Sequence, residues 1–285
     1  MTSFGMYVPQ NAPFPVLAER FRRAEQLGFD QVWVADHIRD HRGVDSPWYD
    51  GWLVLAALAQ TTRTIRLGTL VSNPVLRPPA LLARMAATLD QLSGGRLELG
   101  IGTGIARFDH AAAGVPFWPM AERVKRFAEY VALVDRLLTE APAPVSVAGE
   151  YVVSDGLGIS PPPVQRPRPP LTIAGQSPAV LAVAAAHADR WNTNGPIGRT
   201  EAEVLDLTAA QNATLDKLCV DAGRAPAAVR RSLLLLGDLD AWTSPTSFER
   251  IVDRFTAIGI QEFVVFWPDD ERDLDRAIDV IRARS

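Results

Sequence analysis

Short apolar runs alternate with longer amphipathic stretches along the whole chain. The apolar runs are typical of buried parallel strands, and the amphipathic stretches have the three-to-four-residue spacing of helices. The pattern predicts strands at residues 4–8, 31–35, 65–71, 97–101, 171–174, 190–192, 232–236 and 261–266. It predicts helices at residues 15–27, 48–62, 78–92, 121–138, 177–187, 201–222, 246–258 and 274–282.

A predicted helix follows every predicted strand, which gives eight β-then-α units. Alternation of this kind indicates a parallel sheet, because each helix returns the chain to the end at which the next strand begins. Eight units favour closure into a (β/α)8 TIM barrel over an open α/β sheet. A chain of 285 residues is long enough for one such barrel, so we expect residues 1–285 to form a single domain.

One segment, residues 141–170, interrupts the rhythm between the fourth helix and the fifth strand. It is rich in proline and too long for an ordinary connection, and residues 145–153 could form a hairpin around Gly149 and Glu150. A stiff surface insertion is one interpretation, and a proline-rich docking segment for a partner is the other. An insertion near the barrel mouth could also shape a substrate pocket.

Composition narrows the class of protein. The formal net charge is −4 with both signs spread along the chain, which argues against a nucleic-acid partner. No apolar run approaches the roughly 20 residues of a membrane span, and the N-terminus lacks the features of a secretion signal. The lone cysteine, Cys219, cannot form an internal disulfide, which favours a reducing compartment. We therefore expect a cytoplasmic protein that acts on a small molecule.

Candidate chemistry follows the strands, because the active sites of such barrels form at the carboxyl ends of the strands. Asp36 and His37 follow the second strand. An imidazole titrates near neutral pH and suits acid–base catalysis, and the adjacent carboxylate could orient it. A structural histidine is the alternative. A metal site with Asp40, His41 and Asp45 is less favoured, since no motif of recognised ligand spacing is present, and we expect no metal.

Small residues follow the fourth and fifth strands. The run Gly100–Ile105 resembles a dinucleotide-binding turn but has Ile105 in place of the third glycine. Its glycines still let a ligand approach the backbone closely. The run Ala174–Pro178 precedes a helix, whose free N–H groups could hold an anion. Ordinary N-capping by Ser177 explains the same residues equally well.

Aromatic residues near the predicted strand ends could line a pocket for a flat ring, although burial in a core is the commoner fate of such residues. They are Trp48, Trp52, Phe108, Trp118 and Trp191. No strand end carries the lysine, cysteine or GxSxG serine that covalent catalysis needs. The remaining chemistry favours a bound cofactor that performs the difficult step.

Several segments resemble the bacterial luciferase-like family of flavin- and deazaflavin-dependent oxidoreductases. They are residues 29–37 (FDQVWVADH), 65–71 (IRLGTLV), 89–104 (LDQLSGGRLELGIGTG), 173–175 and 188–191. The resemblance covers most of the chain and is weaker after about residue 200. It implies a barrel of the same kind, with the cofactor ring over the carboxyl ends of the strands. It also implies a non-proline cis peptide bond at Leu70–Val71, against the ring.

The resemblance implies roles for individual residues. Asp36 and His37 match an Asp-His pair of deazaflavin-dependent members, in which the histidine contacts the cofactor and transfers a proton. Positions that hold the ribityl chain and phosphate match Thr103, Gly104, Ile105, Ala174, Gly175, Gln176 and Ser177. Sugar-phosphate dehydrogenases of this family carry a glutamate where Ile105 stands, which argues against their substrate. The nearby Asp109 could compensate for the missing acid.

The Asp-His pair, the compact length and the arginine-rich composition favour the deazaflavin coenzyme F-420 over FMN. We therefore expect an oxidoreductase that transfers a hydride between a deazaflavin and a small organic substrate. One alternative is an FMN-dependent monooxygenase that receives reduced flavin from a separate reductase. Another is a non-catalytic flavin-binding protein. Family members often dimerise, so a homodimer is expected.

Overall fold

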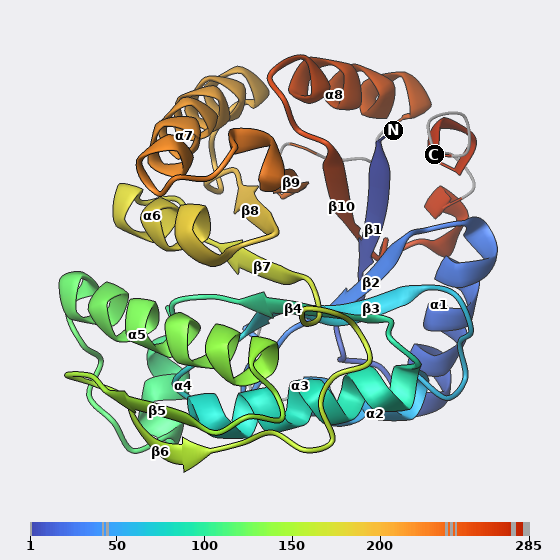
Figure 1. The fold of residues 1–285 in the computed structure, drawn as a ribbon. Coiled ribbons are helices and arrows are strands. Elements are labelled where there is room, and N and C mark those ends of the chain that lie inside the picture. The colour runs from blue at the N-terminus through green and yellow to red at the C-terminus, as the bar shows by residue number, and fades with distance from the viewer. Residues whose placement is uncertain are drawn as a thin grey trace.

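The computed structural model describes residues 2–41, 43, 46–236, 239, 242, 244–274 and 278–281. Eight parallel strands form a closed barrel in the order β1-β10-β9-β8-β7-β4-β3-β2 (Figure 1). They are β1 (Ser3–Tyr7), β2 (Gln31–Val34), β3 (Arg66–Ser72), β4 (Leu97–Ile101), β7 (Leu171–Ala174), β8 (Arg190–Asn194), β9 (Arg230–Leu234) and β10 (Glu262–Phe266). The predicted (β/α)8 TIM barrel is confirmed, and each strand boundary lies within two residues of its prediction.

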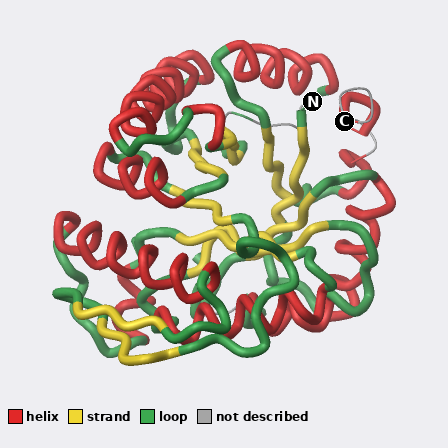
Figure 2. Tube along the Cα trace, viewed as in Figure 1, coloured by secondary structure: helices red, strands yellow, loops and turns green. Residues whose placement is uncertain are grey.

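Helices surround the barrel on its outside (Figure 2). They are α1 (Phe14–Leu27), α2 (Gly51–Leu58), α3 (Pro79–Ser93), α4 (Arg107–Ala112), α5 (Met120–Thr139), α6 (Pro178–His187), α7 (Glu201–Asp221) and α8 (Pro245–Ala257). Short 3-10 turns lie at Pro226–Ala228 and Glu271–Asp273. No described helix is both long enough and apolar enough to span a bilayer.

Two helices differ from the prediction. The helix α4 was not expected, and α2 is shorter than the predicted stretch 48–62. Helix α2 begins at Gly51 because the side chain of Asp50 accepts a hydrogen bond from the backbone N–H of Leu53 and so caps the helix. Of the predicted terminal helix 274–282, the described residues 278–281 are helical and the rest lies partly outside the described residues.

The interior of the barrel changes character from one end to the other. Near the amino-terminal ends of the strands, Arg190 lies 2.7 Å from a carboxylate oxygen of Glu98 and 2.9 Å from one of Glu262. Nearer the carboxyl ends the interior is apolar and includes the buried side chains of Trp33 and Leu70. The barrel therefore has a charged layer at its amino-terminal end and an apolar layer below its mouth, the end formed by the carboxyl termini of the strands.

The insertion forms the predicted hairpin from β5 (Val145–Ala148) and β6 (Val153–Leu157), which pair antiparallel. The second strand extends beyond the predicted 145–153. The proline-rich residues that follow are held by α3, where Arg84 donates to two backbone carbonyls and Gln91 to a third. Asp90 accepts hydrogen bonds from the backbone and side chain of Gln165. These contacts favour a stiff insertion packed on the barrel over a free docking segment.

Glu25, near the end of α1, holds the loop that leads into β3. Its Oε1 accepts hydrogen bonds from the backbone N–H groups of Arg63 at 2.8 Å, Thr64 at 2.7 Å and Ile65 at 3.0 Å. Partial burial raises the pKa of Glu25, but these hydrogen bonds outweigh it and lower the pKa below 4.5. The stabilisation is therefore present above pH 4.5 and is lost as the pH falls through the lowered pKa.

The variant Glu25→Gln is expected to lose about 1 kcal/mol of stability at pH 7, since an amide oxygen accepts weaker hydrogen bonds than a screened carboxylate does. The difference from the wild type should shrink as the pH falls below 4.5 through the lowered pKa of Glu25. Thermal unfolding of both proteins between pH 3 and 7 measures this. The control is Glu19→Gln, because within the described residues Glu19 pairs with Arg22 alone, on the helix surface. A loss that does not change with pH would contradict the assignment.

Candidate functional site

A hydrogen-bonded cluster lies at the barrel mouth and joins the loops that follow β2, β3 and β4. The Nδ1 atom of His37 lies 2.6 Å from Oδ2 of Asp109, a fully buried residue of α4. The same oxygen accepts a hydrogen bond from Nδ2 of Asn73 at 2.7 Å. The other oxygen, Oδ1, accepts one from the backbone N–H of Ile38 at 3.0 Å. His37 is thus anchored to a buried carboxylate while its own side chain stays 22% exposed.

Asp36 does not orient His37, which corrects our sequence-based assignment. Its buried carboxylate accepts hydrogen bonds from Arg77, with Nη2 at 2.8 Å and Nε at 2.9 Å. It also accepts one from the backbone N–H of Asn73 at 3.0 Å. Asp36 therefore holds the loop that follows β3, and Asp109 is the carboxylate that contacts the histidine.

Two of the predicted aromatic residues lie beside His37. Trp48 donates a hydrogen bond from Nε1 to the backbone carbonyl of His37 at 2.8 Å. The ring of Phe108 lies with its centroid 5.8 Å from that of His37 and 5.0 Å from that of His41. These contacts place two aromatic residues beside His37, as expected for a pocket that takes an organic molecule.

Two more of the five aromatic residues, Trp52 and Trp191, are buried in the hydrophobic core, which corrects their assignment to a pocket. Trp191 lies in β8 between Arg190 and Asn192, whose side chains bond inside the barrel to Glu98 of β4 and Ser232 of β9. Because side chains alternate along a strand, Trp191 faces the outer helices. Its Nε1 donates to the carbonyl of Gly175 at 2.8 Å, so it supports the end of β7 from outside.

The end of β3 has the backbone that the family resemblance implies. The peptide bond Leu70–Val71 is cis, so that prediction is confirmed. Leu70 packs with Trp33 and Val264 in a small apolar cluster, and Val71 lies against it. Strands β2 and β3 are paired neighbours, so this cluster lies beneath the mouth next to the strand that leads to His37.

The turn after β4 is held by a buried arginine that sequence reasoning did not single out. The carbonyl of Gly104 accepts hydrogen bonds from Nη1 of Arg123 at 3.2 Å and from Nε2 of His110 at 3.0 Å. Gly104 has a φ of 70°, which favours glycine over any residue with a Cβ. Arg123 is only 7% exposed, yet no described carboxylate pairs with it, and its Nε has no described partner. The guanidinium also stacks on the ring of Phe117, 4.6 Å from its centroid, which offsets part of its charge. A buried cation without a carboxylate partner is costly and favours an arriving anion.

Arg123 faces a cavity of about 150 Å³ between the β4 turn and the insertion hairpin. Thr103, Trp118, Arg126 and Tyr151 are among the residues that line it. The guanidinium of Arg126 stacks on the rings of Trp118 and Tyr151, at 4.2 Å and 4.4 Å from their centroids. This arrangement suits an anionic group that is attached to a larger ligand.

The loop after β7 has features that ordinary helix capping explains. The side chain of Ser177 accepts a hydrogen bond from the backbone N–H of Val180 at 3.4 Å, as an N-cap of α6. Gln176 donates to the carbonyl of Asn194 at the end of β8. Ala174 and Gly175 are half-buried beside them, and Ile105 on the neighbouring loop is exposed. Contact of these residues with a cofactor stays a prediction.

Metal binding finds no support in the described part of the chain, where no three potential ligand side chains are arranged around one point. Asp45, one residue of that alternative, lies outside the described residues.

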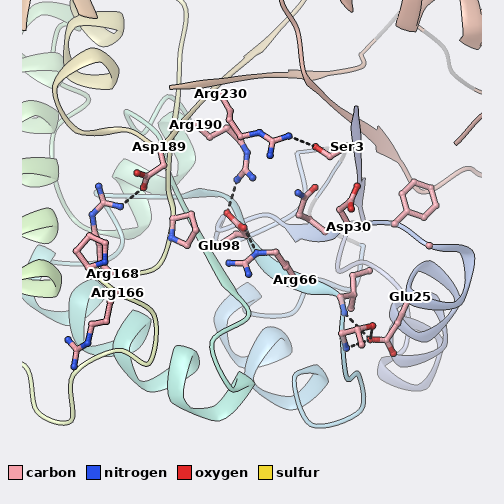
Figure 3. A pocket seen from close by; sticks show the side chains of 17 residues that line it. Ser3, Glu25, Asp30, Arg66, Glu98, Arg166, Arg168, Asp189, Arg190 and Arg230 are labelled. Carbon is pink, nitrogen blue, oxygen red and sulfur yellow. Dashed lines mark hydrogen bonds and ion pairs between the residues drawn. The ribbon is translucent and has the colours of Figure 1, made fainter. Parts of the chain in front are cut away.

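A second cavity, of about 780 Å³, opens at the opposite end of the barrel (Figure 3). Its charged side chains pair with one another, as Arg66 and Arg190 do with Glu98, and Arg168 with Asp189. Residues at the amino-terminal face of such barrels serve stability, whereas chemistry takes place at the carboxyl ends of the strands. We therefore place the candidate site at the mouth.

The structure thus defines a closed (β/α)8 barrel whose mouth combines an anchored histidine, an apolar cluster and a buried, unpaired arginine. Residues 1–236 match the family described as luciferase-like monooxygenase. Because this match spans most of the sequence, the protein belongs to the luciferase-like monooxygenase family.

Individual relatives share shorter regions. The chain is 42% identical over 140 residues to an F420-dependent glucose-6-phosphate dehydrogenase of Intrasporangium calvum, which covers 47% of this chain and 41% of the relative. It is 33% identical over 183 residues to the F420-dependent hydroxymycolic acid dehydrogenase of Mycobacterium tuberculosis, which covers 61% and 48%. The matches therefore span less than half of either relative.

One solved structure shares the fold over the full length. It is an F420-dependent secondary alcohol dehydrogenase in complex with an F420-acetone adduct, with a TM-score of 0.85 and 22% identity. The superposition covers 100% of this chain and 99% of that protein.

Proposed function

We propose that this protein is an oxidoreductase that transfers a hydride between the deazaflavin coenzyme F-420 and a small organic substrate. The observation that carries the proposal is His37, anchored by a buried carboxylate and partly exposed at the barrel mouth. The names of two relatives and of one structural neighbour, all F420-dependent dehydrogenases, support the choice of cofactor. Their matches to this chain do not define its substrate.

The residues at the mouth fit such a cofactor. The apolar cluster beneath the mouth suits one face of a planar ring, and Val71 lies at its edge. The buried guanidinium of Arg123 suits an acidic group, since no described carboxylate neutralises it. Thr103 and Gly104 would hold the chain between ring and acidic group, together with Ile105 and the four residues of the β7 loop, Ala174, Gly175, Gln176 and Ser177. When bound, the deazaflavin supplies the carbon that accepts or gives the hydride.

The residues of the chain would perform the remaining work. His37 would give or take the proton that accompanies the hydride, and its fixed position lowers the entropy cost of that transfer. Trp48 and Phe108, which contact His37, would pack on the substrate and exclude water. Asp36 would hold the β3 loop through Arg77 rather than act on the substrate.

Fluorescence titration of the purified protein with F-420 and with FMN tests the choice of cofactor. We expect at least a roughly 10-fold tighter binding of F-420, which is about 1.4 kcal/mol. A preference for FMN would instead support the monooxygenase, with a separate reductase as its partner. Binding of neither would contradict both enzymes.

The variant His37→Ala tests the proton transfer. Loss of general acid–base catalysis should slow the reduction of bound F-420 by a panel of small alcohols by about 10²–10⁴-fold. The F-420 dissociation constant should change by less than about 10-fold, because the carboxylate and the arginine remain. His187→Ala is the matched control, since His187 pairs with Asp135 on the outer helices. Equal turnover of His37→Ala and wild type would reject the role of His37.

We further propose that residues 1–285 form one domain, with residues 141–170 as an insertion, and that the protein is a cytoplasmic homodimer. The closed barrel and the packing of the insertion on α3 support the single domain. The homodimer is proposed because members of the family often dimerise. Light scattering of the purified protein tests it by measuring the molar mass.

A further inference from the structure

We propose that Asp109 is a positioning residue that fixes the proton of His37 on Nδ1 and leaves Nε2 as the basic atom toward the substrate. The inference rests on the proposed function, because it assigns the geometry of the same acid–base group. It also names a substrate class, namely molecules with a hydroxyl whose proton Nε2 can take, or with the corresponding carbonyl.

The orientation of Asn73 establishes that Asp109 is the hydrogen-bond acceptor. The side-chain oxygen of Asn73 accepts a hydrogen bond from the backbone N–H of Val75 at 3.1 Å. The amide nitrogen of Asn73 must then be the group that points at Asp109, 2.7 Å away. A second donor, the backbone N–H of Ile38, contacts the other carboxylate oxygen at 3.0 Å. Both oxygens of this buried carboxylate therefore accept hydrogen bonds from N–H groups.

The carboxylate of Asp109 determines the tautomer of His37. A carboxylate without a proton only accepts hydrogen bonds, so Nδ1 of His37 must donate across the 2.6 Å contact. A neutral imidazole carries one proton, which leaves the lone pair on Nε2. Within the described residues Nε2 has no hydrogen-bond partner, while the ring is 22% exposed at the mouth. The lone pair is therefore available to a molecule that enters the mouth.

The same contact stabilises the charge that proton transfer creates. When Nε2 takes the hydroxyl proton of an alcohol, whose hydride would go to the deazaflavin, the imidazolium lies against a fully buried carboxylate. Attraction between the two is strong there because little water screens it. In the reverse direction the imidazolium returns the proton to the carbonyl oxygen. Ile105 has no acidic group, and Asp109 therefore acts through His37 as the carboxylate of the site.

Nuclear magnetic resonance tests the tautomer in the protein without any coenzyme. Long-range ¹H–¹⁵N correlation spectra at pH 8 distinguish the two tautomers of each of the four histidines. His37→Gln identifies the His37 signals by their loss. We expect the Nδ1–H tautomer in the wild type. In Asp109→Asn the amide can donate to Nδ1, so we expect the Nε2–H tautomer.

The control is Asp50→Asn, a matched change in a residue that caps α2 and pairs with Arg77 but does not contact His37. It should leave the tautomer unchanged. Asp109→Glu, which keeps the carboxylate, should recover part of the Nδ1–H population. If Asp109→Asn fails to fold, the wild-type tautomer alone decides the question. An Nε2–H tautomer in the wild type, or an unchanged tautomer in folded Asp109→Asn, would overturn the inference.

Turnover distinguishes this inference from the proposed function. With F-420 and an alcohol that reduces it, Asp109→Asn should lower kcat by about 100-fold while KM and the F-420 dissociation constant change by less than about 3-fold. A purely structural role of Asp109 would change all three together. A protein that has the expected tautomer yet does not bind F-420 would overturn the proposed function while the assignment of the proton to Nδ1 stands.

Discussion

Replacing Arg190 with methionine is expected to lower the free energy of unfolding by about 3–5 kcal/mol. Arg190 lies inside the barrel between Glu98 and Glu262, and all three side chains are buried. Burial raises the pKa of Glu262, and Glu98 raises it further, while Arg190 lowers it. Without the guanidinium two like charges face each other in a low dielectric, so the variant should take up a proton there.

The loss should also depend on pH in a definite direction. An acid whose pKa is raised in the folded state destabilises the fold as the pH rises through that pKa. Chemical denaturation of Arg190→Met should therefore show a larger deficit at pH 8 than at pH 5. The matched control is Arg230→Met. Arg230 and Arg190 both line the cavity at the amino-terminal end of the barrel, but Arg230 is exposed and bonds to the hydroxyl of Ser3. Its loss should stay below about 1 kcal/mol. Equal losses in the two variants would show that the charged layer does not stabilise the barrel.

Most strands were predictable because a short apolar run lies beside a turn signal, and eight alternating strand and helix units are compatible with few other folds. The helix α4 escaped prediction for the opposite reason. It has six residues, no side-chain cap and too few turns for a periodic apolar stripe. Yet it carries Asp109, so this six-residue helix supplies the carboxylate at the site.

The side chains that contact His37 are set by the tertiary structure, and the local sequence around His37 does not reveal them. Asp36 is adjacent to His37 in the chain, but neighbouring residues at the end of a strand point in different directions. Asp109 lies 72 residues away from His37 and contacts it because the β2 and β4 loops meet at the mouth. Trp191 and Phe108 illustrate the same limit, since one aromatic residue faces the outer helices and the other faces the site.

Arg123 did leave a signal in the sequence. It stands four residues before Phe127 and eight before Val131, both on the buried stripe of α5. An arginine on an apolar stripe needs a partner, and none is evident nearby in the sequence. The structure places that arginine at the β4 turn, where it bonds to the carbonyl of Gly104 but to no described carboxylate.

The variant Arg123→Met is expected to weaken F-420 binding by about 10–100-fold, the equivalent of one charge-assisted contact of about 1.5–3 kcal/mol. The same change should leave the stability of the coenzyme-free protein within about 1 kcal/mol of the wild type, or raise it. Loss of the hydrogen bond to Gly104 is offset because an unpaired buried charge is removed. Fluorescence titration and chemical denaturation measure the two effects separately.

The control for this prediction is Arg126→Met, which changes a guanidinium that lines the same cavity. Arg126 already pairs with Glu122 at 2.7 Å and is partly exposed, so its charge is compensated before any ligand arrives. Its loss should weaken binding by less than about 5-fold. If Arg123→Met destabilised the free protein strongly and bound F-420 as the wild type does, the buried arginine would be a structural support of the turn. If Arg123→Met instead left the free protein stable and weakened the binding of F-420, the charge of Arg123 would serve to bind a ligand that neutralises it.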